Sequence, residues 1–151
     1  MSGERRAKRS ALVAYTRGQM YRLVDDVERY PEFLPWCRRA VVHHRDAHGV
    51  EATLELQRGG LSRAFTTRNT QSEPEFIRIE LAEGPFRALK GEWTFTALGE
   101  TGCKVELDIR FEFASRILDA LLGPFFEETL NSLVEAFTVR AASVYGPPER
   151  E

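Results

Sequence analysis

Residues 103–113 read CKVELDIRFEF, and this stretch decides the fold. Its apolar side chains alternate strictly with charged ones, from Cys103 to Phe113. Successive side chains of a β-strand point to opposite faces of a sheet, so this strand has one apolar face and one charged face. Such a strand is typical of an antiparallel sheet that is covered on one side only.

The segment that follows is predicted to supply the cover. From Ser115 the apolar spacing changes from every second residue to every third or fourth. A first helical piece contains Ile117, Leu118, Leu121 and Leu122, and Gly123-Pro124 is expected to kink or break it. A longer piece carries an apolar stripe made of Phe126, Leu130, Leu133, Phe137, Ala141 and Val144. This stripe needs an apolar partner, and the apolar face of the sheet is the only large one available.

Five more strands precede residues 103–113, separated by short turn segments. The six strands of this series are predicted near residues 38–46, 49–58, 61–71, 75–83, 88–98 and 102–113. Connections this short force antiparallel neighbours, because a parallel crossover needs about a dozen residues. Before them, RSALVAY at 9–15 predicts a short strand, and Thr16 is placed to cap a helix over 17–27. The predicted order is a strand, one or two short helices, six antiparallel strands and a long closing helix, which is an α+β fold.

The bulk properties fit one globular domain. The chain has 151 residues, of which 42% are hydrophobic and 29% charged, and its net charge is -2. We assign residues 1–7 to a disordered tail, 8–146 to a single domain and 147–151 to a C-terminal tail. The balanced charge argues against a globally basic nucleic-acid binder, so DNA is not expected as a partner, while a local basic patch stays open. Cys37 and Cys103 have no metal-ligand or redox spacing and are interpreted as buried thiols.

The sequence predicts a cytoplasmic location. No segment reaches the ~20 apolar residues that cross a bilayer. The basic N-terminus is not followed by the apolar run and cleavage site of a secretory signal. A peripheral contact with the inner face of the membrane stays open.

The segment YPEFLPWC, residues 30–37, is unusually apolar for a loop. Proline lacks a backbone donor and fixes φ, so this segment is not expected in the middle of a helix or of a central strand. Water-facing loops are normally polar, so the loop is expected to be covered by its own core, by a ligand or by a partner. A twisted sheet curled around one helix often leaves a gap, where a ligand site would be sought.

Three motifs and the order of elements together resemble one known family. The motifs are YPEFLPWC at 30–37, FTTRN at 65–69, and GPFR at 84–87 running on to Leu89, Gly91, Trp93 and Phe95; AFTVRA at 136–141 also fits. The order β-α-α-β6-α is similar to the START-like helix-grip fold of the polyketide cyclase/dehydrase-related superfamily. In that fold a curved antiparallel sheet wraps around a long C-terminal helix. Within it, the motifs resemble the family of coenzyme Q-binding proteins and ribosome association toxins (RatA), over about residues 8–145, and PFR, TTRN and AFTVRA are closer to the RatA branch.

The resemblance implies two functions of different classes. The first is binding of an isoprenoid quinone such as ubiquinone in an internal apolar cavity, in support of respiratory electron transport. The alternative is binding to the large ribosomal subunit, which blocks its joining to the small subunit. A polyketide cyclase-type enzyme shares the fold, but fold does not fix function. We take quinone or lipid binding as the first hypothesis and ribosome inhibition as the alternative, with no catalytic activity and no required cofactor.

A quinone with an isoprenoid tail needs mainly apolar walls, because each buried CH₂ contributes roughly 0.8 kcal/mol. The candidate ligand-binding residues are Phe33, Leu34, Pro35 and Trp36 at the mouth, Phe65, Phe86, Trp93 and Phe95 on the sheet, and Phe126, Leu130 and Leu133 on the helix. Each of these side chains can also be explained as plain core, although Phe33 and Trp36 are the better candidates, because a loop has less reason to be apolar. Arg68 and Asn69 either face a head group, or Arg68 lies on the charged face beside a carboxylate, which we favour.

For the ribosome hypothesis, the basic side chains are the candidates. Arg5, Arg6, Lys8, Arg9, Arg38 and Arg39 are placed to meet RNA phosphates, with a merely solubilising terminus as the other interpretation. No metal site is expected, because the adjacent His43 and His44 point to opposite faces of a strand. The sequence contains no catalytic-triad, paired-carboxylate, phosphate-loop or zinc spacing.

Overall fold

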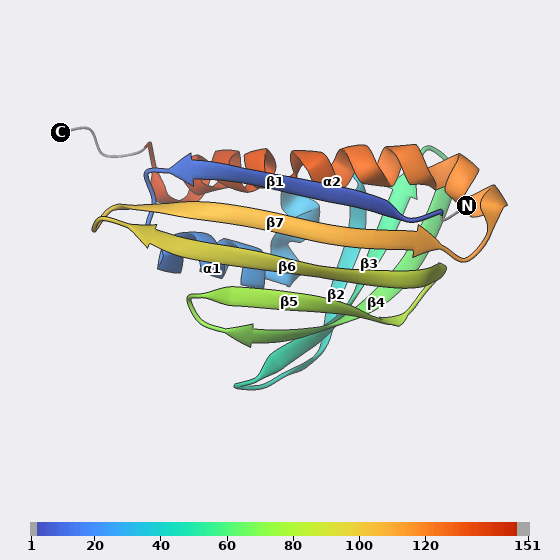
Figure 1. The fold of residues 1–151 in the computed structure, drawn as a ribbon, viewed down its shortest axis with the longest axis horizontal. Coiled ribbons are helices and arrows are strands. Elements are labelled where there is room, and N and C mark those ends of the chain that lie inside the picture. The colour runs from blue at the N-terminus through green and yellow to red at the C-terminus, as the bar shows by residue number, and fades with distance from the viewer. Residues whose placement is uncertain (1–2, 148–151) are drawn as a thin grey trace.

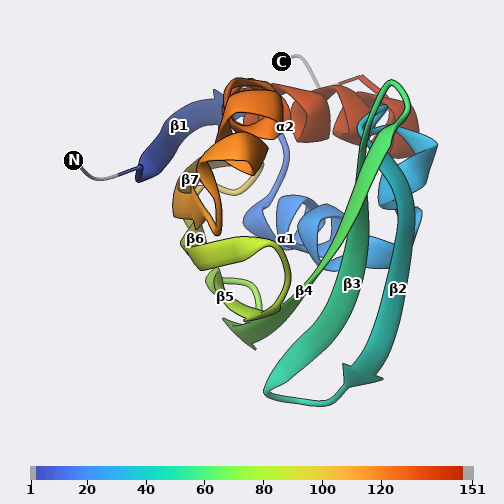
Figure 2. The ribbon, with the colours of Figure 1, turned by 90° about the vertical axis from the view of Figure 1, so that its right-hand side faces the viewer.

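The computed structural model describes residues 3–147 and has the predicted order of elements. Seven strands form one antiparallel sheet in the order β1-β7-β6-β5-β4-β3-β2. The elements are β1 (Arg5–Val13), α1 (Arg17–Asp25), the 3-10 helix η1 (Val27–Glu32), β2 (Cys37–Arg45), β3 (Gly49–Arg58), β4 (Leu61–Ser72), β5 (Phe76–Glu83), β6 (Phe86–Leu98), β7 (Gly102–Phe113) and α2 (Arg116–Tyr145). The sheet curves around an interior that α1 and α2 close, and α2 runs alongside β1 (Figures 1 and 2). The helix-grip fold expected from the sequence is confirmed.

The apolar face predicted for residues 103–113 is also confirmed. Every second side chain of β7, from Cys103 to Phe113, is at most 4% exposed. The helix α2 covers this face with five buried side chains of the predicted stripe, Phe126, Leu130, Leu133, Phe137 and Ala141, and with Leu122 from the first predicted piece. Val144, the last residue of the predicted stripe, is 48% exposed, so the prediction is wrong for that residue. The core of the protein is therefore one apolar layer between the inner face of the sheet and the helices.

The predicted break at Gly123-Pro124 does not occur, because α2 is one continuous helix of 30 residues with Pro124 inside it. Proline has no N–H, so the carbonyl of Ala120 loses its helical donor. The buried side chains of Leu122 and Phe126 anchor the helix on both sides of the proline. Local sequence alone does not reveal this anchoring.

The N-terminal strand begins earlier than the sequence predicted. It spans Arg5–Val13 instead of 9–15, and it pairs with β7 from Arg5 opposite Phe111 to Val13 opposite Cys103. The expected disordered tail is therefore wrong for residues 5–7, where Ala7 is fully buried. Residues 1–2 and 148–151 lie outside the described residues, so the remainder of both predicted tails stays a prediction.

The segment YPEFLPWC is partly helical, which the sequence did not predict. Residues 30–32, with Pro31, form the last turn of η1, and the chain leaves this turn with Leu34 N donating to Tyr30 O at 2.9 Å. A short 3-10 turn tolerates the proline, whereas an α-helix interior does not. The expected helix over 17–27 ends at Asp25, with Thr16 and Gln19 forming the capping box at its start.

One ion-pair cluster ties the N-terminal strand to α2. The Arg5 guanidinium donates to Asp119 at 2.9 and 3.0 Å and to Glu127 at 3.3 Å. It lies flat over Gly123, where a Cβ atom would be only 2.6 Å from Arg5 Nε. The hydrogen bonds from Arg5 hold the pKa of Asp119 below its ordinary value. We call these residues, Arg5, Asp119, Gly123 and Glu127, the Arg5 cluster.

We predict that the Arg5–Asp119 pair stabilises the fold in a pH-dependent way. Because the folded pKa of Asp119 is depressed, the contribution is complete above the ordinary aspartate pKa of about 4 and is lost as the pH falls through the lower folded value. A double-mutant cycle with Arg5→Met and Asp119→Asn, measured by urea unfolding, should give a coupling of about 1 kcal/mol at pH 7. The coupling should shrink toward zero in acid.

The more exposed pair of Arg6 and Asp108, whose side chains are 44% and 40% exposed, is the matched control. Its cycle with Arg6→Met and Asp108→Asn should give a smaller coupling at pH 7, because solvent screens it. A coupling for Arg5–Asp119 that does not change with pH would contradict the assignment.

Candidate functional site

A small cavity lies between the inner face of the sheet and α2, with a volume of about 70 Å³. The sheet contributes residues of β3, β4, β5, β6 and β7, and the long helix contributes Phe126, Leu130, Leu133 and Phe137. Tyr30 closes one side from η1. The lining is therefore almost wholly apolar and comes from elements far apart in the chain.

Phenylalanine rings fill most of the gap that the sequence predicted here. Phe86 stacks on Phe113 with ring centroids 4.7 Å apart, and Phe126 meets Phe111 edge-on at 5.0 Å. Phe65 meets Phe86 at 5.4 Å. All five side chains are buried. Such contacts are typical of a packed core, in which aromatic rings prefer edge-on or offset geometry.

The volume of the cavity limits what it can hold. Pockets that bind drug-sized ligands usually have about 300–1,000 Å³. A water molecule occupies about 30 Å³ in the liquid, so a cavity of about 70 Å³ is on the scale of two water molecules. An isoprenoid quinone would enter only if side chains of the lining moved.

Two polar atoms in this apolar setting lack a protein partner. Trp36 Nε1 and Asn69 Oδ1 are buried without a hydrogen bond to any described residue, and both residues line the cavity. Leaving a buried donor or acceptor unpaired costs about 1–3 kcal/mol. Thr67, also buried, lies between Phe65 and Asn69 along β4 and lines the cavity as well. The cavity thus offers one N–H donor and one carbonyl acceptor to a small polar group.

The structure brings six of the predicted ligand-binding residues to the cavity wall, namely Trp36, Phe65, Trp93, Phe126, Leu130 and Leu133. Leu34, Phe86 and Phe95 are buried elsewhere in the core, and Pro35 is exposed. Their role in binding a ligand stays a prediction.

Phe33 does not line the cavity. Its ring packs edge-on against Phe137 at 5.2 Å on the outer side of that residue, and the Arg140 guanidinium lies over it at 4.8 Å. Arg140 in turn pairs with Glu32 at 2.9 Å. The aromatic side chains of the proline-rich segment therefore divide, because Trp36 points into the interior and Phe33 covers α2 from outside.

Of the two polar residues on the β4 side of the cavity, the sequence interpretation offered Asn69 as one that could face a head group, and it missed Thr67. Phe65, Thr67 and Asn69 have the same parity along β4, so they share the inner face of the sheet. This signal was present in the motif FTTRN, although it was not used to place Thr67. Arg68 lies on the outer face, 3.7 Å from Glu51, which confirms the favoured interpretation of that residue.

The predicted RNA-contact residues differ in their availability. Arg5 belongs to the Arg5 cluster, Arg6 pairs with Asp108 at 2.8 Å, and Arg9 donates to Asn131 at 3.1 Å. Arg38 and Arg39 are exposed on β2, and neither has a carboxylate at ion-pair distance within residues 3–147. Lys8 also has none there.

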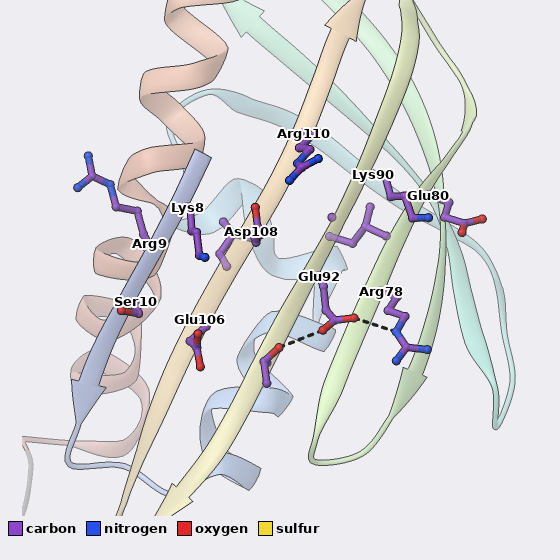
Figure 3. Close-up of a pocket in the computed structure, with 14 residues that line it drawn as sticks. Lys8, Arg9, Ser10, Arg78, Glu80, Lys90, Glu92, Glu106, Asp108 and Arg110 are labelled. Carbon is purple, nitrogen blue, oxygen red and sulfur yellow. Dashed lines mark hydrogen bonds and ion pairs between the residues drawn. The ribbon is translucent and has the colours of Figure 1, made fainter. Parts of the chain in front are cut away.

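The outer face of the sheet carries a broad open depression of about 930 Å³. Figure 3 shows that side chains of both signs share it. Lys8, Lys90 and Arg110 lie among Glu80, Glu106 and Asp108, and Arg78 pairs with Glu92 at 2.8 Å. Because the charges offset one another, this face is best explained as the solvated side of a half-buried sheet.

The two thiols are buried and free, as expected. Burial raises the pKa of both Cys37 and Cys103 to about 11, so neither is a thiolate at neutral pH. In the part of the chain that the structure describes, there is no group of three or more His, Cys, Asp and Glu side chains placed to hold a metal ion. Nor does any helix between residues 3 and 147 have the length and apolar content to cross a membrane.

Comparison with known proteins gives matches along nearly the whole chain. The family model described as polyketide cyclase / dehydrase and lipid transport matches residues 13–138. The ribosome association toxin RatA of Vibrio cholerae is 44% identical over 143 residues, which cover 94% of this chain and 99% of that protein. The mitochondrial coenzyme Q-binding protein COQ10 of Drosophila melanogaster is 30% identical over 141 residues, which cover 91% of this chain and 58% of that protein.

Solved structures show the same fold. The crystal structure of an aromatase/cyclase from Streptomyces has a TM-score of 0.79 and covers 91% of this chain and 93% of its own. At 16% sequence identity, this likeness concerns the fold alone.

We predict that Trp36 acts as a core residue as well as a cavity wall. Its side chain is 8% exposed and meets Phe126 edge-on at 6.4 Å. Trp36→Ala should lower the free energy of unfolding by about 3–5 kcal/mol in urea titrations, the range for large aromatic deletions. Trp36→Phe keeps much of the ring and removes the unpaired N–H, so its loss should be less than half as large. If both variants lower the free energy of unfolding by an equally small amount, residues 30–37 form a loosely held lid.

Proposed function

We propose that this chain associates with the ribosome and inhibits translation. The chain belongs to the polyketide cyclase / dehydrase and lipid transport family. Within that family it belongs to the group of RatA toxins and coenzyme Q-binding proteins. In this proposal it binds the large subunit and thereby blocks subunit joining. The observation that carries the proposal is the match to a ribosome association toxin along 94% of this chain and 99% of that protein.

The packing of the interior supports a function at the surface. The cavity has a volume of only about 70 Å³, and aromatic and aliphatic side chains line it. A protein that acts by docking onto a ribosome needs no larger interior space, whereas a carrier of an isoprenoid ligand does. The surface function therefore fits the structure without any rearrangement of the core.

The arginine pair on β2 is the part of the surface best placed to meet RNA phosphates. In a regular strand two adjacent side chains point to opposite faces, but a register shift between Cys37 and Arg39 interrupts the pairing of β2 with β3. As a result, Arg38 and Arg39 are both exposed. β2 is also an edge strand of the sheet, so the pair is accessible from the side. Because the whole chain has a net charge of -2, only a locally positive part of its surface can make such a contact with RNA.

We infer that the action is binding and not catalysis. The names of the relatives point to association and ligand binding, as in "ribosome association toxin" and "coenzyme Q-binding protein". Enzymes share the fold, as the aromatase/cyclase structure illustrates, but a shared fold does not transfer an activity.

A second candidate function is binding of a hydrophobic ligand, such as a quinone, in the interior. One specific observation favours it, namely the unpaired Trp36 Nε1 and Asn69 Oδ1 in an otherwise apolar cavity. A quinone carbonyl could accept from Trp36, and its tail would lie against the aromatic walls. Native mass spectrometry and organic extraction of protein purified from cells would detect such a ligand. If no quinone co-purifies with the protein and added quinone does not bind, this second candidate is contradicted, whereas the ribosome proposal is not affected.

We predict that expression of the protein separates ribosomal subunits, and that Arg38 and Arg39 contribute to this effect. Sucrose gradients of expressing cells should show fewer joined ribosomes and more free subunits. The variant Arg38→Glu/Arg39→Glu should bind purified large subunits more weakly, with a salt dependence reduced by about one unit of slope per lost phosphate contact.

The matched control is Lys90→Glu/Lys104→Glu, which makes the same charge change on β6 and β7, at least four strands away from β2. It should leave binding and its salt dependence close to those of the natural chain. Unchanged ribosome profiles on expression would contradict the ribosome proposal as a whole. Equal loss in both double variants would contradict only the role of the arginine pair.

A further inference from the structure

The first three turns of α2 carry an apolar surface that faces solvent. Ile117 is 73% exposed and Leu121 is 49% exposed, although both are large aliphatic side chains. Ala120 and Pro124 are exposed beside them, and Phe125 is half-buried one turn further on. Single exposed apolar residues need no explanation, but a contiguous apolar patch marks an interaction site. We call these five residues the α2 patch.

The helix is apolar on both its inner side and its solvent-facing side in this region, which is unusual for a helix at a protein surface. Its inner face is covered, with Leu122 fully buried and Leu118 packed against the core. From Ile117 to Phe126 the only charged residue is Asp119, and that side chain faces β1 and pairs with Arg5. A helix that packs on a core with one face is normally polar on the other. The α2 patch therefore needs an apolar partner of its own.

Arginine side chains without a carboxylate partner border this patch. The tip of the β3–β4 hairpin lies at the same end of the molecule as the start of α2 (Figures 1 and 2). From the hairpin, Arg58 donates to the carbonyl of Leu121 at 2.7 Å, and its guanidinium lies over the ring of Phe125 at 5.3 Å. This contact joins the hairpin to the patch.

Two further arginines extend the positive border. Arg63 is exposed near the hairpin tip and donates only to the carbonyl of Ser62, and Arg116 is exposed at the first position of α2. Like Arg58, neither has an acidic side chain at ion-pair distance within the described range. The nearest acidic residue on the exposed side of α2 is Glu128, beyond Phe125. Apolar surface and unpaired positive charge thus meet at one end of the protein.

We propose that this end docks onto an anionic lipid membrane. Ile117 and Leu121 enter the interfacial region of the bilayer, and Arg58, Arg63 and Arg116 lie against lipid phosphates. Membrane interfaces offer hydrocarbon and negative charge side by side, which is the combination that the surface presents. RNA phosphates would match the arginines but would leave the aliphatic side chains without a partner.

The position of the patch relative to the cavity fits this partner. Phe125 lies outside beneath Arg58, and the next residue, Phe126, lines the cavity. The patch is therefore separated from the interior only by α2 itself. A docked protein would hold its apolar interior next to the bilayer. This inference does not depend on ribosome association and is tested separately from it.

Vesicle co-sedimentation tests the proposal directly. The natural chain should bind vesicles of phosphatidylcholine with phosphatidylglycerol more tightly than vesicles of phosphatidylcholine alone, and the difference should fall with added salt. Arg58→Gln and Arg63→Gln should each weaken binding to the anionic vesicles about fivefold. Ile117→Ser/Leu121→Ser should weaken it about tenfold or more, because two aliphatic side chains no longer leave water.

Val139→Ser is the matched control, because Val139 is 64% exposed on the second half of α2. It should bind vesicles as the natural chain does. Ile117→Trp provides a direct measure of depth, because its fluorescence should be quenched by brominated phospholipid, whereas that of Val139→Trp should not be. The natural tryptophans, Trp36 and Trp93, are buried and should contribute an unquenched background.

Several outcomes would overturn the proposal. The natural chain could fail to bind anionic vesicles, or bind both kinds of vesicle equally. The double serine variant could retain full vesicle binding with unchanged thermal unfolding by circular dichroism. If the double serine variant instead loses self-association in light scattering, or loses RNA retention, while vesicle binding is unaffected, the patch serves a second copy or RNA. If that variant does not fold, the absence of quenching in Ile117→Trp would count against the proposal in the same way.

Discussion

The apolar inner face of the sheet has to be covered, and the rest of the structure depends on this requirement. β7 alone presents six apolar side chains to that face, and α2 covers them with its own buried stripe. Burying a side chain of this size contributes about 1.5–3 kcal/mol, so no local preference of α2 competes with its position on the sheet. The cavity, the Arg5 cluster and the α2 patch are all placed by where the helix lies.

This dependence explains which parts of the fold could be predicted from the sequence. A strand with one apolar face can be predicted from the alternation of its residues alone, as in 103–113. A helix that covers this face can be predicted from the spacing of its apolar residues. The start of β1 could not be predicted in this way, because Arg5 finds its carboxylate partner 114 residues further along the chain. The continuity of α2 through Pro124 could not be predicted either, because it depends on the buried side chains of Leu122 and Phe126 on both sides of the proline.

The candidate site was predictable in its location but not in its size. Parity places Phe65 and Trp93 on the inner face, and it would also have placed Thr67 there, beside Asn69, which the sequence had already offered as a head-group contact. The volume is decided by contacts between rings from distant segments. Phe126 alone meets Trp36, Phe65, Phe86, Phe111 and Phe113. Composition and spacing carry no information on how completely such rings fill a gap, and the expected gap is therefore mostly core.

The same packing determines how much binding free energy an interior ligand would have to provide. Phe126 is one of the lining residues, and moving it would also disturb the part of α2 that Arg5 holds through Asp119 and Glu127 on either side of Gly123. Lost ring contacts and lost ion pairs would then oppose binding. A head group that pairs with Trp36 and Asn69 gains only about 1 kcal/mol per hydrogen bond. A hydrocarbon tail gains roughly 0.8 kcal/mol for each CH₂ that leaves water, so only a long tail offsets the opening of this core. An interior ligand that is larger than the cavity would therefore be selected mainly by its hydrocarbon tail.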